Sequence, residues 1–288
     1  SALQDLAFDT EFEVPPMFGD GEPVALSMTS SVSTLNFTPQ GGIIGLKAAV
    51  VAPKGTDLPS PGSIHRGGCL TNEGPFQFWM MNEIEMGLFD NFLNQIPYAM
   101  WWAGLLTIPL DAATLGGGSF EEYGIEDMEM VATALLPPVI TDCPSGDEVL
   151  IQMGDMEIAA AMSMWGMPVE VTMYVAFEAE IEIGVATDGP QTVLVMGVTD
   201  VKSVKLELAT VSENLVGSED GLRLLVKQHV LPLFLEQITG DSLASIPLPS
   251  IDVGAMVPEV PDGTTLDMTP KTSYRDKGYT TISGTVHE

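Results

Sequence analysis

Alternation of apolar and polar residues is the main pattern along the chain, and it predicts long strands. Every second residue from Val169 to Ile183 is apolar, whereas most of the residues between them are Glu or Thr. A period of two is typical of an antiparallel strand that buries one face. Turn signals such as PQGG, PSGD and TDGP separate this run from similar ones. The other predicted strands span residues 24–38, 42–53, 78–88, 147–164, 191–200 and 202–216.

Two segments break the alternation and carry apolar residues at helical spacing. The first covers residues 87–106, GLFDNFLNQIPYAMWWAGLL, with Asp90 as the predicted N-cap. The second covers residues 218–249 and begins with a serine that can serve as a cap. Each segment contains an internal proline, Pro97 and Pro232, at which we expect a kink. Two bent helices among long strands predict an α+β fold.

The first of these helical segments contains a long uncharged stretch. Residues 91–110 carry no charge, and a stretch of about 20 apolar residues is long enough to cross a membrane. However, Asn91, Asn94, Gln95 and two prolines interrupt it, and no basic flank marks a cytoplasmic end. We therefore expect a buried helix rather than a membrane span.

The composition allows a large core and excludes some partners. The chain has 288 residues, of which 45% are hydrophobic, enough for one large domain or two modest ones. Its formal net charge of −30 repels phosphate backbones and anionic lipid headgroups. Nucleic acid and the phosphates of lipopolysaccharide are therefore not expected as partners. We interpret the acid excess as a solvated shell, and since no EF-hand loop pattern occurs, we predict no metal site.

Two cysteines, Cys69 and Cys143, cannot form a disulfide framework, but we expect one bridge between them. In an exported protein, a bridge closing a loop of this length would contribute about 4 kcal/mol. Two buried free thiols are the alternative. The sequence begins with Ser-Ala and shows no signal segment, so we expect any export signal to lie outside it.

Catalytic motifs are missing from the sequence. The only histidines are His65, His229 and His287, and there is no G-x-S-x-G, H-E-x-x-H, P-loop or dinucleotide pattern. His65 lies near Cys69, but proximity in sequence does not make a nucleophile and a base without a third group to orient them. We expect no enzymatic activity and no cofactor.

Methionine is unusually frequent, with 17 residues in the chain. Unbranched thioether side chains adapt to irregular apolar ligands, although they also fill ordinary cores. We expect seven of them on inner surfaces: Met80, Met86, Met100, Met153, Met162, Met164 and Met173.

Four segments together resemble the family of bactericidal/permeability-increasing protein, lipopolysaccharide-binding protein and cholesteryl ester transfer protein. These segments are GLFDNFLNQIPYAMWWAGLL, LLPPVITDCPSGDEVLIQM, HVLPLFLEQITGDSLASIPLPSI and DKGYTTISGTVHE. The resemblance covers residues 75–288 and, more faintly, the strands in 24–53. In the first segment, the matching residues are Gly87, Leu88, Asp90, Phe92, Asn94, Ala103, Gly104 and Leu106.

The resemblance implies a tubular lipid-binding (TULIP-like) domain, closest to the C-terminal barrel of the family. In this fold, a highly twisted antiparallel sheet wraps around a long kinked helix, a second helix lies alongside, and an apolar groove holds lipid tails. We expect residues 1–288 to form one such domain. Its parts would be N-terminal strands in 1–53, interpreted as the remnant or end of a preceding barrel, a connector in 54–74 and the barrel in 75–288.

Three departures from the family pattern limit what the resemblance implies. The chain has room for one barrel instead of two, so a tunnel with two pockets is not expected. The basic patches that hold lipopolysaccharide phosphates are missing, so that ligand is not carried over. Phe89 stands where the family has a serine N-cap, which leaves Asp90 to cap the helix.

The resemblance predicts a lipid carrier outside the cytoplasm, in the periplasm or the extracellular space, with transient membrane contact and an anchor in an upstream segment. Its cargo would be a neutral or weakly polar lipid, such as a phospholipid, a sterol or a fatty acyl compound. A structural or protein-interaction domain with a filled barrel is the alternative. The predicted groove residues are Leu88, Phe92, Ile96, Met100, Met173, Val175, Phe177, Leu225, His229 and Leu233.

Overall fold

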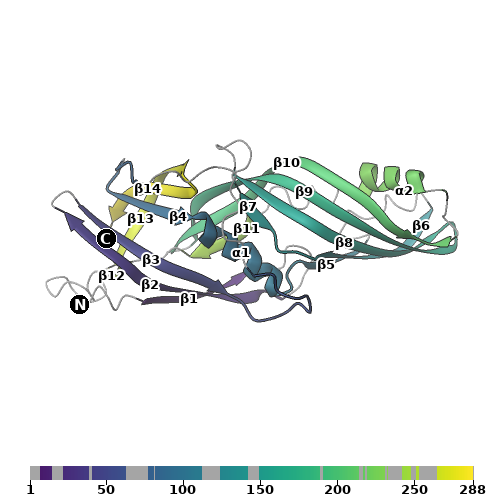
Figure 1. Ribbon diagram of the computed structural model, residues 1–288, viewed down its shortest axis with the longest axis horizontal. Coiled ribbons are helices and arrows are strands. Elements are labelled where there is room, and N and C mark those ends of the chain that lie inside the picture. The colour runs from purple at the N-terminus through teal and green to yellow at the C-terminus, as the bar shows by residue number, and fades with distance from the viewer. Residues whose placement is uncertain are drawn as a thin grey trace.

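Three antiparallel sheets form most of the described structure of the chain (Figure 1). The computed structural model describes residues 7–14, 22–38, 41–62, 77–80, 82–111, 124–141, 149–188, 191–213, 217, 219–230, 232, 242–247, 251–252 and 265–287.

The first sheet has three strands in the order β1-β2-β3. They are β1 (Ala7–Val14), β2 (Val24–Thr38) and β3 (Gly41–Val51). Residues that pair across neighbouring strands share one face of a sheet. The register pairs Phe12 with Leu26 and Met28 with Val50, and all four side chains are buried. This face, called the inner face below, therefore packs on the core.

The second sheet is the largest, with the order β11-β10-β9-β8-β6-β5 and β7 paired to β8. Its odd-numbered residues from Val169 to Ile183 are all buried, as the alternation predicted. The two predicted strands in 191–216 are one strand, because β-bulges shift the register instead of ending the pairing. The strands are β5 (Thr107–Asp111), β6 (Ile125–Ala134), β7 (Val139–Thr141), β8 (Leu150–Met164), β9 (Met167–Asp188), β10 (Gln191–Val211) and β11 (Ser242–Pro247).

The third sheet joins the end of the chain to a strand from its first third, in the order β12-β13-β14-β4. Its strands are β12 (Ile251–Asp252), β13 (Thr265–Asp276), β14 (Tyr279–His287) and β4 (Ile84–Phe89). The register pairs Ile282 with Met86 and Thr280 with Leu88. Ile282 is buried in the core, and Met86 and Leu88 are partly buried against it. The face that carries these residues is therefore the core side of the third sheet.

Within the described ranges, two short helical segments interrupt the strands. Helix α1 (Asp90–Trp102) follows β4 directly, and α2 (Glu219–Leu225) continues into a π-helical turn at Val226–Val230. Helix α1 ends before Gly104, whose φ of +83° lies in the left-handed region that favours glycine. The uncharged run at 91–110 therefore divides into a helix and strand β5. Among the described residues, no helix has both the length and the apolar character that a membrane span requires.

The predicted α+β fold is wrong. In that prediction, a sheet wraps around a long kinked helix and a second helix lies alongside. Strands make up 69% of the described residues and helices 12%. Helix α1 has 13 residues, runs through Pro97 and contacts β3, β4 and β7. Helix α2 instead contacts β10 and lies at the far end of the long sheet (Figure 1). Helix α1 begins at the position where the sequence predicted its start, but it is short, and the two helices contact different strands instead of lying side by side.

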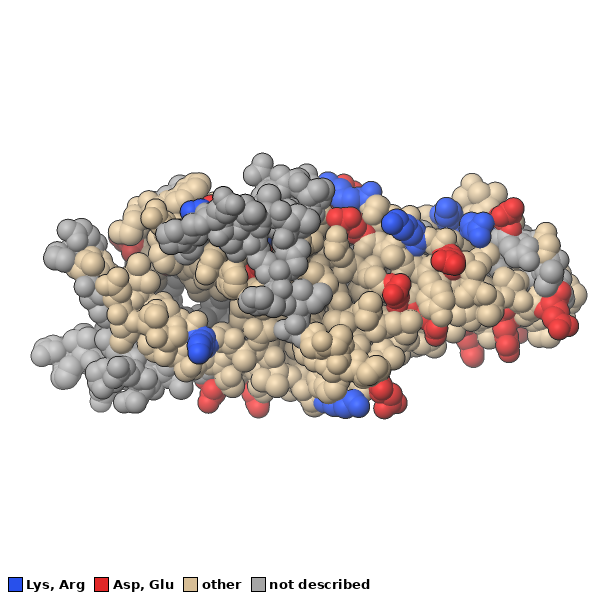
Figure 2. Space-filling model, in the orientation of Figure 1, with Lys and Arg blue, Asp and Glu red and all other residues tan. Residues whose placement is uncertain are grey.

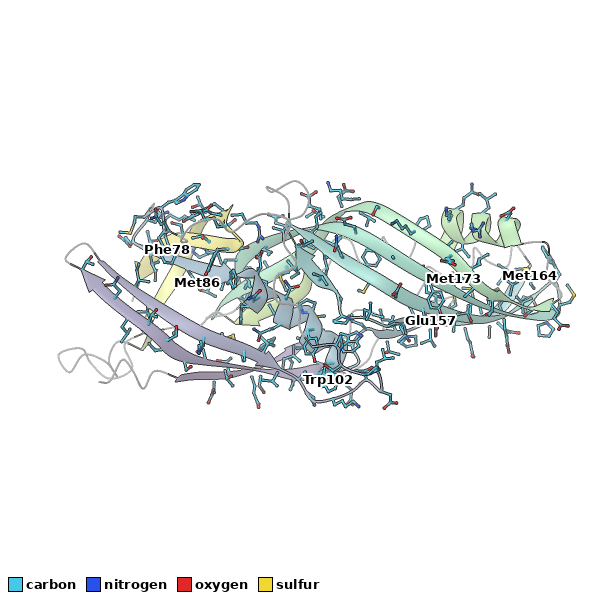
Figure 3. All side chains as sticks on the ribbon, in the orientation of Figure 1. Phe78, Met86, Trp102, Glu157, Met164 and Met173 are labelled. Carbon is cyan, nitrogen blue, oxygen red and sulfur yellow. The ribbon has the colours of Figure 1, made fainter. Side chains whose placement is uncertain are left out.

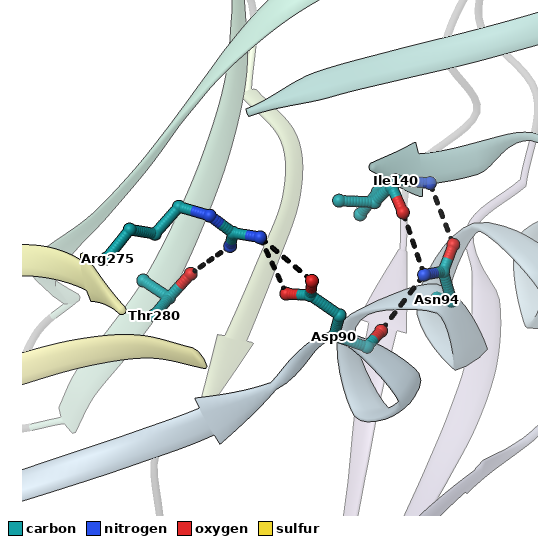
Figure 4. A network of polar contacts seen from close by, with 5 residues as sticks. All are labelled: Asp90, Asn94, Ile140, Arg275 and Thr280. Atoms are coloured by element: carbon teal, nitrogen blue, oxygen red, sulfur yellow. Dashed lines mark hydrogen bonds and ion pairs between the residues drawn. The ribbon is translucent and has the colours of Figure 1, made fainter. Parts of the chain in front are cut away.

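The predicted N-cap role of Asp90 is also wrong. Phe89 is the N-cap residue, its backbone is extended and it makes no side-chain capping bond. Asp90 is the first helical residue, and its carboxylate accepts two hydrogen bonds from Arg275 Nη2, at 2.9 Å and 2.8 Å (Figure 4). The carboxylate therefore joins the helix to β13 instead of capping its own N–H groups.

The segment after β3 packs against the C-terminal end of α1. Gly55 N donates to Trp102 O over 2.8 Å, and Thr56 N donates to the same oxygen over 3.2 Å. The ammonium of Lys54 lies 5.4 Å from the centroid of the Trp102 ring. This segment therefore caps the last turn of α1, which has no basic residue of its own.

Candidate functional site

The candidate site is an apolar slot between the first and third sheets. The slot is defined by seven side chains, four from the inner face of the first sheet and three from β4. They are Val32, Leu35, Ile44, Leu46, Ile84, Met86 and Leu88.

Burial along the inner face of the first sheet decreases from α1 towards the β2–β3 turn. Leu26 has no exposed surface and Val50 is 8% exposed. Farther along, the register pairs Val32 with Leu46 and Leu35 with Ile44, which keeps all four on the inner face despite a β-bulge in β2. Leu46 is 41% exposed and Ile44 38% exposed. The apolar face therefore continues beyond the closed core into a region that is open to solvent.

Strand β4 provides the opposite wall of the slot. Ile84, Met86 and Leu88 alternate along β4, share the core side of the third sheet and are half-buried. Figure 3 shows the labelled Met86 between β4 and the first sheet. An unbranched thioether at this position can adapt to an irregular apolar partner.

Contacts at both ends bring the two sheets together around the slot. At one end, α1 contacts both β3 and β4, and Gln95 Oε1 accepts a hydrogen bond of 3.0 Å from Val50 N. At the other end, Met80 Cε lies 4.0 Å from the position that a Cβ would take at Gly41. Between these ends, Figure 2 shows an opening between the sheets on the face that it draws.

The residues before β4 are fixed on the third sheet. The ring of Trp79 stacks on Tyr274 with centroids 4.3 Å apart, and Trp79 N donates to Tyr274 Oη over 3.3 Å. Met80 N donates to Glu85 Oε2 over 2.9 Å. These contacts hold Met80 where it meets the β2–β3 turn.

The walls of the slot are close to electrically neutral. On the inner face of the first sheet, no described residue with a defined side chain is charged. On the core side of the third sheet, Arg275 is 10% exposed and forms its ion pair with Asp90. The slot therefore offers apolar surface without a free charge among the described residues.

Two tyrosines outside the slot walls have shifted pKa values. Burial, the largest cause, raises the pKa of Tyr274 above its ordinary value. The pKa of Tyr174 is raised mainly because its hydroxyl donates a hydrogen bond of 3.1 Å to Glu157 Oε2, which favours the protonated form. Neither shift places a titrating group near neutral pH, so neither tyrosine indicates acid–base chemistry.

Seven of the ten predicted groove residues have described side chains, and these seven divide into two groups. Leu88 lies in the slot, Phe92 is half-buried at the start of α1, and Ile96 and Met100 are buried in the core. The second group lies on the buried face of β9, and Figure 3 shows its member Met173 in the distant half of the long sheet. This second group consists of Met173, Val175 and Phe177.

Strand β10 continues the buried face of β9 onto the neighbouring strand. Its residues Val204, Leu206 and Leu208 pair with Phe177, Val175 and Met173 and are half-buried. Leu225 and His229 lie in α2 and the π-helical turn that follows it, but their side chains are not described. Leu233, Cys69 and Cys143 lie outside the described residues. The predicted groove between two adjacent helices therefore has no counterpart in the described structure.

The predicted methionines also differ in burial. Met86 and Met162 are half-buried and Met80 is 67% exposed. The other four fill the core, in agreement with the alternative that methionine serves ordinary packing there. They are Met100, Met153, Met164 and Met173.

Sequence reasoning missed Ile44 and Leu46 as site residues. Strand β3 reads GGIIGLKAAVV and has apolar residues on both faces, so the alternation that marks an inner face is weak there. Only pairing with β2 shows which of these residues share a face with Leu26 and Met28. The sequence did contain one signal for this part of the site: residues 41–51 carry a single charge, on Lys47, in a strongly acidic chain.

Comparison with known proteins gives only weak structural likeness. No protein-family profile matches the chain, and no curated protein matches it. The chain aligns with a crystal structure of lipopolysaccharide binding protein at 11% identity and a TM-score of 0.30. The alignment covers 91% of this chain and 54% of the other, so the chain spans about half the length of that protein.

Proposed function

We propose that this protein binds a neutral or weakly polar lipid in the slot between the first and third sheets. The observation that carries the proposal is the exposure of Ile44 and Leu46, at 38% and 41%, on the same sheet face that buries Leu26 completely. Aliphatic side chains on an inner sheet face gain about 25 cal/mol per Å² when a ligand covers them. A lipid tail in the slot would complete the burial that the protein leaves unfinished.

The dimensions of the slot suit a single acyl chain. From Ile44 to Ala48, the partner of Ser30 at the closed end, β3 advances by four residues, or about 13 Å at about 3.3 Å per residue. Burying about ten methylene groups over that length contributes on the order of 8 kcal/mol before the costs of association. This free energy favours binding without any charged contact.

The cellular setting belongs to the same proposal. A carrier that collects lipid from a membrane would work outside the cytoplasm, where a bridge between Cys69 and Cys143 could persist. A net charge of −30 favours solubility and opposes lasting attachment to an anionic bilayer. Membrane contact is therefore transient in this proposal, and the protein carries its cargo without chemical turnover.

A different function would use the same exposed residues. Ile44 and Leu46 could be covered by side chains of another protein, which would make the domain a structural or interaction module. The half-buried Met86 on the opposite wall favours a flexible apolar ligand, because methionine adapts to partners without a fixed shape.

The test compares neighbouring residues on opposite faces of β3. Ile44→Asp places a charge in the slot, whereas Ile43→Asp, at a side chain that is 49% exposed, places the same charge on the outer face. Both sites are exposed, so both variants should fold. A pyrene probe with an alkyl tail should bind the wild type and Ile43→Asp, and binding to Ile44→Asp should weaken at least about tenfold.

Mass spectrometry of an organic extract of the purified protein provides an independent measurement. A lipid recovered in stoichiometric amount from the wild type, and lost from Ile44→Asp, agrees with a carrier. If the extract contains no lipid and the two variants bind the probe equally, the slot is not a lipid site and the interaction module is the better interpretation.

A further inference from the structure

The closed end of the slot contains a buried polar group without a partner. Ser30 lies on the inner face of the first sheet, one position from Val32 along that face, and pairs with Ala48. It is 8% exposed, and its Oγ has no hydrogen-bond partner within the described part of the chain. Its neighbours along this face of β2 are Met28 and Val32, so the hydroxyl stands at the transition from the closed core to the open slot.

A buried hydroxyl without a partner is costly, and proteins rarely keep one without a reason. Ser30 occupies a row that is otherwise apolar, from Leu26 through Met28 to Val32. An alanine or valine would fit the pattern of the row and avoid the cost. The hydroxyl can both donate and accept a hydrogen bond, so a hydroxyl, ester or ketone group on a ligand would satisfy it.

The charge of the surroundings restricts the chemical class of that ligand group. Ser30 has no cation beside it on the inner face, because Lys47 points to the outer face and Arg275 is held by Asp90. A carboxylate or phosphate that reached Ser30 would be buried without a counter-ion, which is unfavourable. An uncharged polar group does not carry this penalty.

We infer that the slot binds a neutral lipid with an uncharged hydrogen-bonding group at one end, which enters polar end first and hydrogen-bonds Ser30 Oγ. The hydrocarbon tail then follows Val32 and Leu46 towards the opening, against Met86. Long-chain alcohols, monoesters and sterols have this chemistry, whereas free fatty acids at neutral pH and phospholipids do not. This inference rests on the proposed function, because it requires the slot to be the lipid site.

The test measures binding of three pyrene probes that share one alkyl chain. The free end of the chain carries a methyl group in the first probe, a hydroxyl group in the second and a carboxyl group in the third. Ser30→Ala removes the hydroxyl and keeps the small side chain. It should weaken binding of the hydroxyl-ended probe by about fivefold to tenfold and leave the methyl-ended probe unchanged or tighter. The carboxyl-ended probe should bind the wild type more weakly than the hydroxyl-ended probe at neutral pH.

Ser31→Ala is the matched control, because Ser31 is exposed on the outer face beside Ser30. It should change none of the three affinities, and thermal unfolding checks that both variants fold. If Ser30→Ala affects the methyl-ended and hydroxyl-ended probes equally, the inference is overturned while lipid binding stands. If no probe binds the wild type, the proposed function itself fails.

Discussion

Arg275 and Asp90 form a bidentate ion pair, with Arg275 Nη2 at 2.9 Å from Oδ1 and 2.8 Å from Oδ2 of Asp90 (Figure 4). Their side chains are 10% and 1% exposed. Arg275 Nη1 also donates to Thr280 Oγ1 over 2.9 Å. Because Asp90 starts α1 and Arg275 belongs to β13, the pair fixes the helix to the third sheet and so sets the position of the closed end of the slot.

Removing one charge of this pair should destabilise the fold. Asp90→Asn leaves Arg275 buried with an uncompensated charge, and we expect the free energy of unfolding to fall by about 3–5 kcal/mol. Urea unfolding measures the change. Asp220→Asn is the control, because its pair with Arg223 is exposed and such pairs contribute about 0–1 kcal/mol. Equal losses in the two variants would contradict a structural role for the buried pair.

The fold should also be destabilised by loss of the Asn94 side chain, because its amide hydrogen-bonds the backbone of β7 as a neighbouring strand would. Asn94 Nδ2 donates to Ile140 O over 2.9 Å, and Asn94 Oδ1 accepts from Ile140 N over 2.7 Å (Figure 4). Asn94→Ala leaves both backbone groups of Ile140 unsatisfied in a buried place, so we expect a loss of about 2–4 kcal/mol in unfolding free energy. The exposed Asn36→Ala should change it by less than about 0.5 kcal/mol.

The contact between Gly55 and the end of α1 leaves no room for a side chain. A Cβ added at Gly55 would lie 1.9 Å from Ala103 O, so Gly55→Ala must push the segment away from the helix and break its bonds to Trp102 O. We expect a clear fall in the melting temperature. Gly154→Ala, where an added Cβ meets nothing within 4 Å, should keep the melting temperature near that of the wild type. Similar melting temperatures for the two variants would show that the segment moves freely.

The strands were largely predictable from sequence because their alternation depends on local residue order. The predicted strand 24–38 matches β2, and the alternation from Val169 to Ile183 matches the buried face of β9. The helices were less predictable, because apolar spacing in residues 87–106 does not show that β4 continues to Phe89 or that Gly104 ends the helix. Helix ends depend on tertiary contacts, such as Arg275 binding Asp90, that a local pattern does not contain.

The site was less predictable than the fold. Leu88 was found through its place in the matched segment, but Ile44, Leu46 and Ser30 gain their meaning only from the pairing of β2 with β3. A serine in a strand is ordinary in sequence, and only its burial without a partner marks Ser30. The sequence of a single strand does not show which of its faces is turned inward, so it could not identify these site residues.

The contact of Met80 with the β2–β3 turn should control how fast a ligand leaves the slot. Met80 is 67% exposed, so Met80→Ala should cost little stability, yet it removes the side chain that reaches Gly41 at the end away from α1. We expect several-fold faster dissociation of an alkyl-pyrene probe in stopped-flow fluorescence, with a smaller change in association rate.

The control for this prediction is Met167→Ala, an exposed methionine at the start of β9 on the long sheet. It removes the same side chain at a site outside the slot, so any general effect of losing an exposed thioether would show there. Because the two positions have comparable chemistry and differ in their contact with the β2–β3 turn, equal dissociation rates in the two variants would mean that the ligand leaves by a path that does not pass Met80.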